Sequence, residues 1–190
     1  MTDPQRDHPP GPSAGSAVPS WAAGVAAGLA AAGCHDVLYV PDNPLSHILE
    51  ALRRDHPGVR TRLATREEEA MGIAAGLHLG GARPAVLMQS SGLGNTLNAI
   101  GSLLVPYQIP LLMVISMRGD AGEWNAAQVP MGRAVVPVLD AFGIEHLAVE
   151  RGEEAEGTVL ALAHLAFGTR TQAACLLPRR LTVPVRGGVA

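Results

Sequence analysis

The feature that most constrains the fold is a regular alternation of short apolar runs with longer helical patterns. The runs with the length and character of buried strands are "DVLYV", "VRTRLA", "PAVLMQ", "PLLMVIS", "IEHLAV" and "AACLL". Helical patterns surround them at about residues 19–32, 44–55, 66–81, 93–104, 131–142 and 153–167. Such alternation predicts a parallel sheet with right-handed crossovers and helices on both faces. We therefore expect an α/β three-layer sandwich whose parallel sheet has about six strands.

The length and apolar content of the chain favour one domain with a full core. The chain has 190 residues, of which 47% are hydrophobic. Residues 1–18 are rich in Pro, Gly and Ser and poor in residues that could be buried. We expect a disordered N-terminal arm there, a domain at 19–180, and a C-terminal tail at 181–190.

Charge and cysteine content exclude several classes of function. The formal net charge is −3 and the 14 Lys and Arg residues are scattered, so neither nucleic acid nor an acidic membrane surface is an expected partner. Cys34 and Cys175 lie far apart and belong to no CxxC or Cys/His cluster, which favours a reducing compartment and no metal site. No apolar run reaches the roughly 18 to 20 residues that span a bilayer, and the N-terminus lacks a secretory pattern, so we expect a cytoplasmic protein.

Polar residues gather after the predicted strands. The segments that follow the first four strands are "PDN", "TREEE", "QSSGLGN" and "SMRGDAGE", whereas the opposite ends carry ordinary turns such as "HPG" and "GARP". Ligands of parallel α/β sheets bind beyond the carboxyl ends of the strands. These four segments are therefore the predicted site.

The individual motifs in these segments are weak signals. "SGLGNTLN" reads as a Gly-x-Gly loop between strand and helix, which is either a ligand-binding loop or a tight turn. Leu97 stands where a dinucleotide fingerprint has its third glycine, and no phosphate-loop Lys is present. Ser90 and Ser91 lack the GxSxG context of a hydrolase nucleophile. Arg118, in an "RGD" tripeptide, either grips an anionic group or is a solvated loop residue.

The run "REEEAMGIAAGLHLGG" at residues 66–81 sets three glutamates before a helix of small and apolar residues. Acidic residues in a first turn favour the helix dipole by roughly 0.3–1 kcal/mol each, so they need no catalytic role. Every face of the helix is small and apolar, which predicts that it is buried against the sheet or another subunit. Spacing alone does not distinguish Glu67, Glu68 and Glu69.

The order of these motifs resembles a known family. "VPDN", then "TREEEAMGIAAGLHLGGARPAVLMQSSGLGNTLNAI", then "LLMVISMRGDAGEWNAAQVPMGRAVVPVLDAFGI" are similar to the pyrimidine-binding domain of thiamine-diphosphate-dependent 2-oxo acid decarboxylases. Within that family the nearest likeness is to the sulfopyruvate decarboxylase alpha subunit and to phosphonopyruvate decarboxylase. The likeness covers about residues 20–180. It implies the thiamine-diphosphate pyrimidine-binding fold.

The resemblance also assigns roles to residues. The catalytic glutamate of the family falls on Glu67, nine residues before Gly76, where it would bond the pyrimidine ring nitrogen and control a proton. The cofactor-binding positions that it implies are Pro41, Glu67, Ser90, Leu93 and Gly94. The substrate-binding positions that it implies are Asp42, Ser91, Asn95, Arg118 and Gln128.

A partner subunit follows from what the family needs and this sequence lacks. In the family, a Gly-Asp-Gly run followed by an Asn holds Mg²⁺ on the diphosphate. Gly119-Asp120 is followed by Ala121 and has no matching Asn, so Mg²⁺ is expected to be bound by a separate diphosphate-binding beta subunit. The resemblance therefore implies a hetero-oligomer that is active only when complete, with the Gly-rich helix at 70–81 in the contact.

Two other classes of function stay open from the sequence. One is a non-catalytic regulatory or scaffold subunit of the same fold, and the other is a nucleotide-binding module that uses the Gly-x-Gly loop. Within the decarboxylase hypothesis, the small anionic 2-oxo acid is 3-sulfopyruvate or 3-phosphonopyruvate. Arg118 and Arg133 suit either anion.

Overall fold

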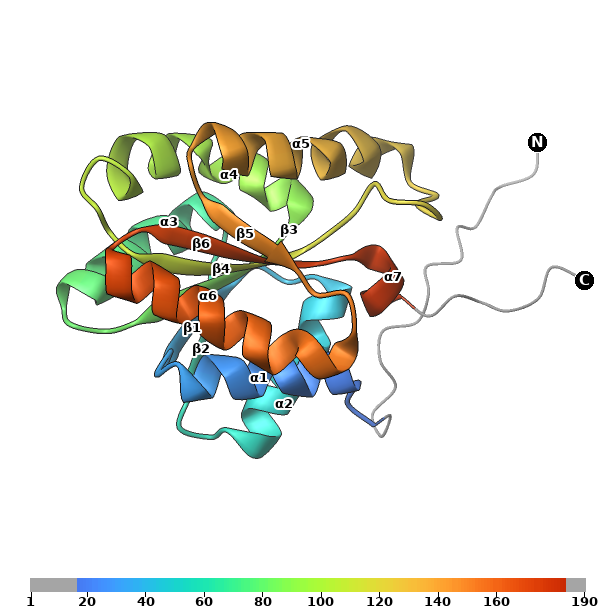
Figure 1. Cartoon of the computed structure of the whole chain (residues 1–190), viewed down its shortest axis with the longest axis horizontal. Helices are drawn as coiled ribbons and strands as arrows, with labels where there is room; N and C mark the ends of the chain where they lie inside the picture. The colour runs from blue at the N-terminus through green and yellow to red at the C-terminus, as the bar shows by residue number, and fades with distance from the viewer. Residues whose placement is uncertain (1–16, 184–190) are drawn as a thin grey trace, which may run out of the picture.

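Residues 17–183 are described by the computed structural model, and a parallel sheet lies at their centre (Figure 1). The sheet has six strands in the order β2-β1-β3-β4-β6-β5, and all neighbouring strands run parallel. The strands are β1 (Asp36–Tyr39), β2 (Arg60–Leu63), β3 (Pro84–Gln89), β4 (Leu111–Ser116), β5 (Glu145–Ala148) and β6 (Gln172–Leu177). The parallel α/β prediction is confirmed.

Helices cover both faces of the sheet, which makes three layers. They are α1 (Ser20–Ala31), α2 (Asn43–Asp55), α3 (Glu67–Leu79), α4 (Ser90–Ala99), α5 (Val129–Ala141), α6 (Ala155–Thr169) and α7 (Arg179–Thr182), with the π-helix η1 (Ile100–Leu104) and the short 3-10 helices η2 (Ala126–Gln128) and η3 (Gly152–Glu154). Figure 1 shows α1, α2 and α6 on one face and α3, α4 and α5 on the other. This placement keeps the crossovers right-handed.

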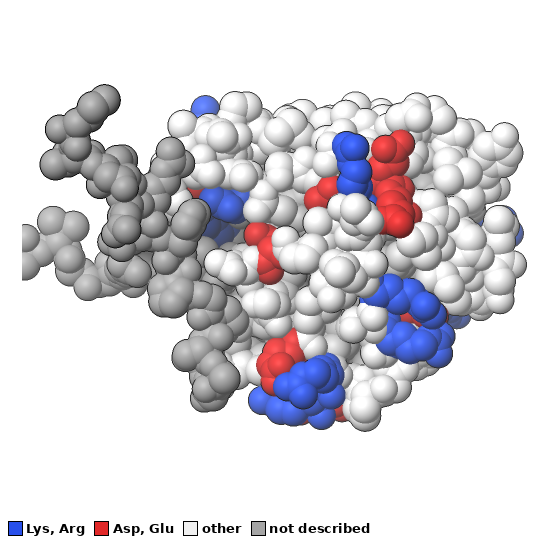
Figure 2. Space-filling view, turned by 180° about the vertical axis from the view of Figure 1, so that it is seen from behind, with Lys and Arg blue, Asp and Glu red and all other residues white. Residues whose placement is uncertain are grey.

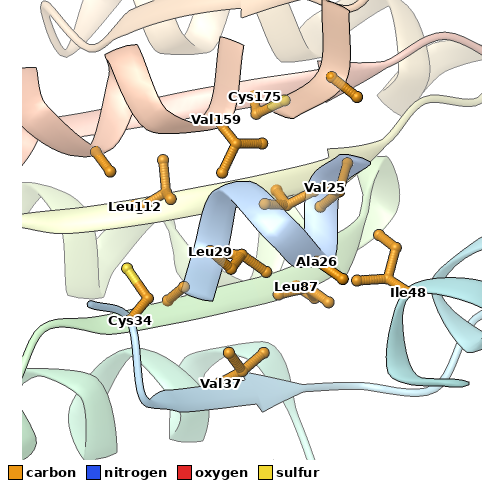
Figure 3. Packing of buried hydrophobic residues seen from close by; sticks show 14 of the residues in the cluster. Val25, Ala26, Leu29, Cys34, Val37, Ile48, Leu87, Leu112, Val159 and Cys175 are labelled. Atoms are coloured by element: carbon orange, nitrogen blue, oxygen red, sulfur yellow. The ribbon is translucent and has the colours of Figure 1, made fainter. Parts of the chain in front are cut away.

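The core consists of two apolar layers, one on each face of the sheet. Successive side chains of a strand point to opposite faces. Accordingly, Ala85 and Leu87 of β3 pack in the layer under α1, α2 and α6, while Val86 and Met88 pack under α3, α4 and α5. Figure 3 shows part of the first layer, with Leu29 among the side chains that gather over the strands.

The two edge strands depart from the prediction that every strand is a buried apolar run. All four residues of β2 are exposed, and Leu63 keeps 64% of its surface. Arg60 and Arg62 reach from this edge to the buried Asp36 of β1, with N–O distances of 2.6 and 2.9 Å. Charged side chains along an edge strand discourage pairing with other sheets, so β2 ends the sheet.

Helix α3 is only half buried within this chain. Ala70, Met71 and Ala74 pack on the sheet, whereas Ile73 is 38% exposed and Leu79 is 79% exposed. The prediction was a helix buried against the sheet or another subunit, and the sheet covers one face of it. Whether a second subunit covers the exposed face stays a prediction.

Helix α4 begins earlier than predicted. The sequence predicted that the segment "QSSGLGN" at residues 89–95 follows the strand and that a helix runs from about Leu93 to Leu104, but β3 ends at Gln89 and the helix begins at Ser90. The backbone of Gln89 is extended, with φ −82° and ψ 158°, so the turn takes place at one residue. The predicted Gly-x-Gly loop is the first turn of a helix.

The chain ends lie mostly outside the described residues. The predicted arm at 1–18 lies almost wholly outside the described residues, as does most of the predicted tail at 181–190. No helix in the described part of the chain is long and apolar enough to cross a membrane. On the face shown in Figure 2, arginines lie beside acidic residues and form no broad basic area.

Candidate functional site at the carboxyl edge of the sheet

The predicted polar segments do share one edge of the sheet. In a parallel sheet the carboxyl ends of all strands lie together. The helix after β1 packs on one face, and the helix after the neighbouring β3 packs on the other. The connections that leave β1 and β3 therefore go to opposite faces of the sheet, which makes a topological switch point between these two strands. A crevice at such a switch point is the usual ligand-binding position of this architecture.

Glu67 is the first residue of α3 and is held close to α4. Its residue surface is 9% exposed. The amide Nδ2 of Asn95 donates a hydrogen bond of 3.0 Å to Glu67 Oε2. A Cβ atom on Gly92 would lie only 2.4 Å from Glu67 Oε1, so the other oxygen lies against the glycine backbone. Glycine at 92 is thus what allows this carboxylate to approach the helix.

The neighbouring glutamates lie in the first turn of α3. Glu69 Oε2 accepts a hydrogen bond of 2.6 Å from the backbone N–H of Thr65, just before the helix. That bond lowers the pKa of Glu69. Glu68 is exposed. A surface hollow of about 400 Å³ is lined by Thr65, Arg66, Glu68 and Glu69.

Asp42 connects the strands at the switch point. It precedes α2 as the N-cap residue, yet its side chain does not cap that helix. Instead, Gln89 Nε2 donates to Oδ1 at 2.9 Å and Ser116 Oγ donates to Oδ2 at 2.6 Å. Ser91 Oγ donates to Gln89 Oε1 at 2.6 Å and extends the network. The carboxylate therefore joins the ends of β1, β3 and β4.

Arg118 forms an ion pair with a buried acid of its own loop, Glu123. Its Nε and Nη2 atoms donate to Glu123 at 2.7 and 2.9 Å, and the Glu123 side chain is 1% exposed. The Nε of Arg179, just after β6, lies 3.7 Å from the same carboxylate. The hydrogen bond from Arg118 is the main reason that the pKa of Glu123 falls to about 2. Arg118 thus organises this loop, and its substrate role stays a prediction.

Helix α5 packs closely against this loop and against α4, and a glycine lies at each contact. A Cβ on Gly132 would lie 1.9 Å from the carbonyl oxygen of Arg118, so only glycine fits there. Likewise, a Cβ on Gly94 would lie 2.9 Å from Met131 Cε, which brings α4 and α5 together. Packing at the site edge therefore accounts for glycine at position 132.

The remaining predicted residues differ in their access to a ligand. Pro41 is exposed at the end of β1. Ser90 and Leu93 are fully buried, and Leu93 belongs to the apolar layer under α3 and α4. The predicted contact of Leu93 with a cofactor stays a prediction. The buried Ser90 Oγ and Gln128 Oε1 have no hydrogen-bond partner among the described residues.

Four contributors to the site were not singled out from the sequence. Gln89, Ser116 and Glu123 lay inside the predicted segments, but nothing local showed which side chains they bind. Arg179 lay at the end of the predicted domain at 19–180 and was given no role, although it follows β6 almost directly and so had to emerge at the same edge. Position after a predicted strand was the signal that could have found it.

The sequence matches, over residues 20–128, the family described as "Thiamine pyrophosphate enzyme, N-terminal TPP binding domain". The chain belongs to this family. The match includes Glu67 and the Asp42 network, so these residues lie in the N-terminal TPP binding domain of a thiamine pyrophosphate enzyme.

Its relatives within the family are decarboxylases. The chain is 40% identical over 153 residues to the sulfopyruvate decarboxylase subunit alpha of Methanothermobacter thermautotrophicus, covering 80% of this chain and 92% of that protein. It is 46% identical over 116 residues to the same subunit of Methanocaldococcus jannaschii, covering 61% and 68%. It is 38% identical over 125 residues to the phosphonopyruvate decarboxylase of Streptomyces viridochromogenes, covering 65% of this chain but 31% of that longer protein.

A solved structure supports the fold. The 2-oxoglutarate:ferredoxin oxidoreductase of Magnetococcus marinus aligns with a TM-score of 0.72 at 16% identity, covering 85% of this chain and 29% of that one. At this identity the likeness concerns the fold alone. The thiamine-diphosphate pyrimidine-binding fold expected from the sequence agrees with this alignment.

Proposed function

We propose that this chain is the pyrimidine-binding alpha subunit of a two-subunit thiamine-diphosphate-dependent decarboxylase. Its substrate is an anionic 2-oxo acid, 3-sulfopyruvate or 3-phosphonopyruvate, and its products are the aldehyde and CO₂. Relatives with both names match this chain, and one named as an alpha subunit matches along 92% of its own length. The observation that carries the proposal is the placement of Glu67.

Glu67 has the properties that the proposed proton transfer requires. It lies at the carboxyl edge of the sheet, where ligands of this architecture bind. Its carboxylate is mostly shielded from solvent, and Oε2 accepts from Asn95 while Oε1 accepts no hydrogen bond from the described residues. A carboxylate with one uncommitted oxygen can bond a ring nitrogen and hold or release a proton there.

The residues around Glu67 fit the pyrimidine of thiamine diphosphate. Gly92 leaves room where any side chain would collide with the carboxylate. Pro41 is exposed at the neighbouring strand end and offers an apolar surface, while the unpartnered hydroxyl of Ser90 lies close along the chain to Gly92. When bound, the cofactor supplies an electron sink for the loss of CO₂, and Glu67 controls the proton on the ring.

A second subunit completes the site in this proposal. Among residues 17–183, no group of three or more His, Cys, Asp or Glu side chains is placed to hold a metal ion. Asp120 does not serve as a metal ligand in this proposal, since its carboxylate faces the backbone N–H of Arg179 at 3.4 Å. We assign Mg²⁺ and the diphosphate to a beta subunit with a Gly-Asp-Gly…Asn motif. The exposed face of α3 is the surface that we assign to the contact.

The substrate anion is assigned to the polar end of the same edge. Arg118 and Arg179 share the carboxylate of Glu123, and their side chains are 20% and 16% exposed. Arg133 is exposed and forms no ion pair within the described part of the chain. Guanidinium groups suit sulfonate and phosphonate equally, so the choice between the two substrates rests on kinetics.

The test is to express the chain with the diphosphate-binding subunit encoded in the same genome and to measure CO₂ release from both 2-oxo acids. We expect turnover by the complex with thiamine diphosphate and Mg²⁺, and none by the isolated chain. Glu67→Gln should lower kcat by about 10²–10⁴-fold, the usual worth of a positioned proton-transfer group.

The alternatives make different predictions in the same experiment. A scaffold subunit would tolerate Glu67→Gln without loss of turnover. A nucleotide-binding module would be stabilised against heat by NAD or ATP and not by thiamine diphosphate with the partner. Decarboxylation by the purified chain alone would overturn the two-subunit assignment.

A further inference from the structure

The contact between Asn95 and Glu67 differs from the role that the sequence assigned to Asn95. The family likeness placed Asn95 among the substrate-binding positions. In the structure its side-chain amide donates to Glu67 Oε2 at 3.0 Å, across from one helix to the next. Asn95 lies in the second turn of α4, and Glu67 is the first residue of α3. The amide therefore reaches the proposed catalytic carboxylate itself.

The two oxygens of Glu67 have different surroundings. Oε2 accepts the amide N–H, and an N–H donor requires a free lone pair on that oxygen. Oε1 lies over Gly92, where an added Cβ would be 2.4 Å away, and no hydrogen bond within the described residues engages it. A carbonyl-type oxygen accepts an N–H bond better than a protonated one, so the bond from Asn95 to Oε2 favours Oε1 as the position of a proton on this carboxyl group.

We propose that Asn95 is a positioning residue that holds Oε2 of Glu67 and leaves Oε1 to exchange the proton with the cofactor ring. This inference rests on the proposed function of Glu67. The hydrogen bond fixes the rotation of the carboxylate, and Gly92 fixes its depth against α4. Small errors in such geometry are costly, since a displacement of 1 Å can lower a rate by about 10²-fold.

The chain offers a matched control for Asn95. Asn98 lies one turn further along α4, is exposed, and accepts a hydrogen bond from Ser102 rather than contacting Glu67. Asn95 is also exposed as a residue, so its replacement by Ala should not unfold the chain. Asn95→Asp keeps the shape of the side chain but replaces the donor with a charge that repels Glu67.

The test is a double-mutant cycle on the reconstituted complex, with two readouts. The first is the Kd for thiamine diphosphate by titration calorimetry, and the second is kcat and KM for the 2-oxo acid. We expect Asn95→Ala to weaken cofactor binding by about tenfold and to lower kcat by about 10- to 100-fold, with KM changed less than about threefold. Asn95→Asp should weaken cofactor binding and lower kcat further than Asn95→Ala does. Asn98→Ala should have the Kd and kcat of the wild type.

The cycle separates positioning from direct contact. If Asn95 acts through Glu67, Asn95→Ala has almost no further effect in the Glu67→Gln background. Additive losses in the double variant, or a raised KM with unchanged kcat, would overturn the proposal and return Asn95 to substrate binding. If Glu67→Gln itself changes neither Kd nor kcat, the proposed function fails rather than the positioning role alone.

Discussion

Replacing Gly92 by Ala should inactivate the enzyme without unfolding it. The new Cβ would lie 2.4 Å from Glu67 Oε1 and 2.6 Å from both Cδ and Cγ. An ordinary contact needs 3.4 Å or more, so the Glu67 side chain must retreat by about 1 Å. Since Cγ is hit as well as the carboxylate, rotating the terminal group does not relieve the overlap. A displacement of that size should lower kcat/KM by about 10²-fold, or roughly 2.7 kcal/mol of transition-state stabilisation.

The same variant should be as stable as the wild type or slightly more stable. Alanine favours a helix over glycine by up to about 1 kcal/mol. Gly157 provides the control, because it is also the third residue of its helix and no atom lies within 4 Å of its added Cβ. Gly157→Ala should therefore keep full activity and raise the melting temperature slightly.

The assays are steady-state decarboxylation by the reconstituted complex and thermal unfolding followed by circular dichroism. Gly92→Ala with kcat/KM within threefold of the wild type would refute the reasoning, because Glu67 would then tolerate the displacement. A large fall in melting temperature that accompanies the loss of activity would also count against it, since the effect would then be one of folding.

Three further results are expected. The pKa of Glu123 lies at about 2 instead of 4.5 because Arg118 donates to it, so the stabilisation that it provides is complete above pH 4.5 and is lost as the pH falls towards 2. Urea unfolding should accordingly find Glu123→Gln less stable by roughly 3 kcal/mol at pH 7, with the difference shrinking below pH 4.5. Ile73→Glu should leave the isolated chain folded but prevent assembly with the beta subunit, measured by analytical ultracentrifugation, because an unpaired charge would be buried. Burial raises the pKa of the Cys34 and Cys175 thiols to about 12, so neither should react with iodoacetamide at pH 8 until the chain unfolds, as mass spectrometry can check.

The order of strands and helices could be predicted because buried parallel strands and amphipathic or small-residue helices leave periodic patterns in the sequence. The start of α4 could not, because serine and glycine favour turns in isolation. Here Ser90 and Gly92 are small because the helix begins directly against the sheet and Glu67. The preference of serine and glycine for turns is real, but the close contact of α4 with the sheet and with Glu67 outweighs it.

The partners of the site residues depended on the tertiary structure in the same way. Glu67 could be singled out from Glu68 and Glu69 only through its position in the family motif, since every face of its helix was small and apolar. Arg118 was read as a free cation because its acid stands five residues later, beyond a turn with Gly119 and Gly122 at positive φ. Which strands lie at the edge likewise depends on the strand order of the whole sheet. The exposure of β2 follows from its position at one end of that order rather than from its own sequence.

The structure of the loop between β4 and α5 indicates which of its positions can vary in sequence. Arg118 and Glu123 are tied together at its base, and Gly132 presses against the backbone there. Between these fixed points Trp124 is 61% exposed. Variation at the base would disturb the packing of α5, whereas variation at the tip would not. We therefore expect substitutions at position 124 to be tolerated, while Arg118, Glu123 and Gly132 stay constant.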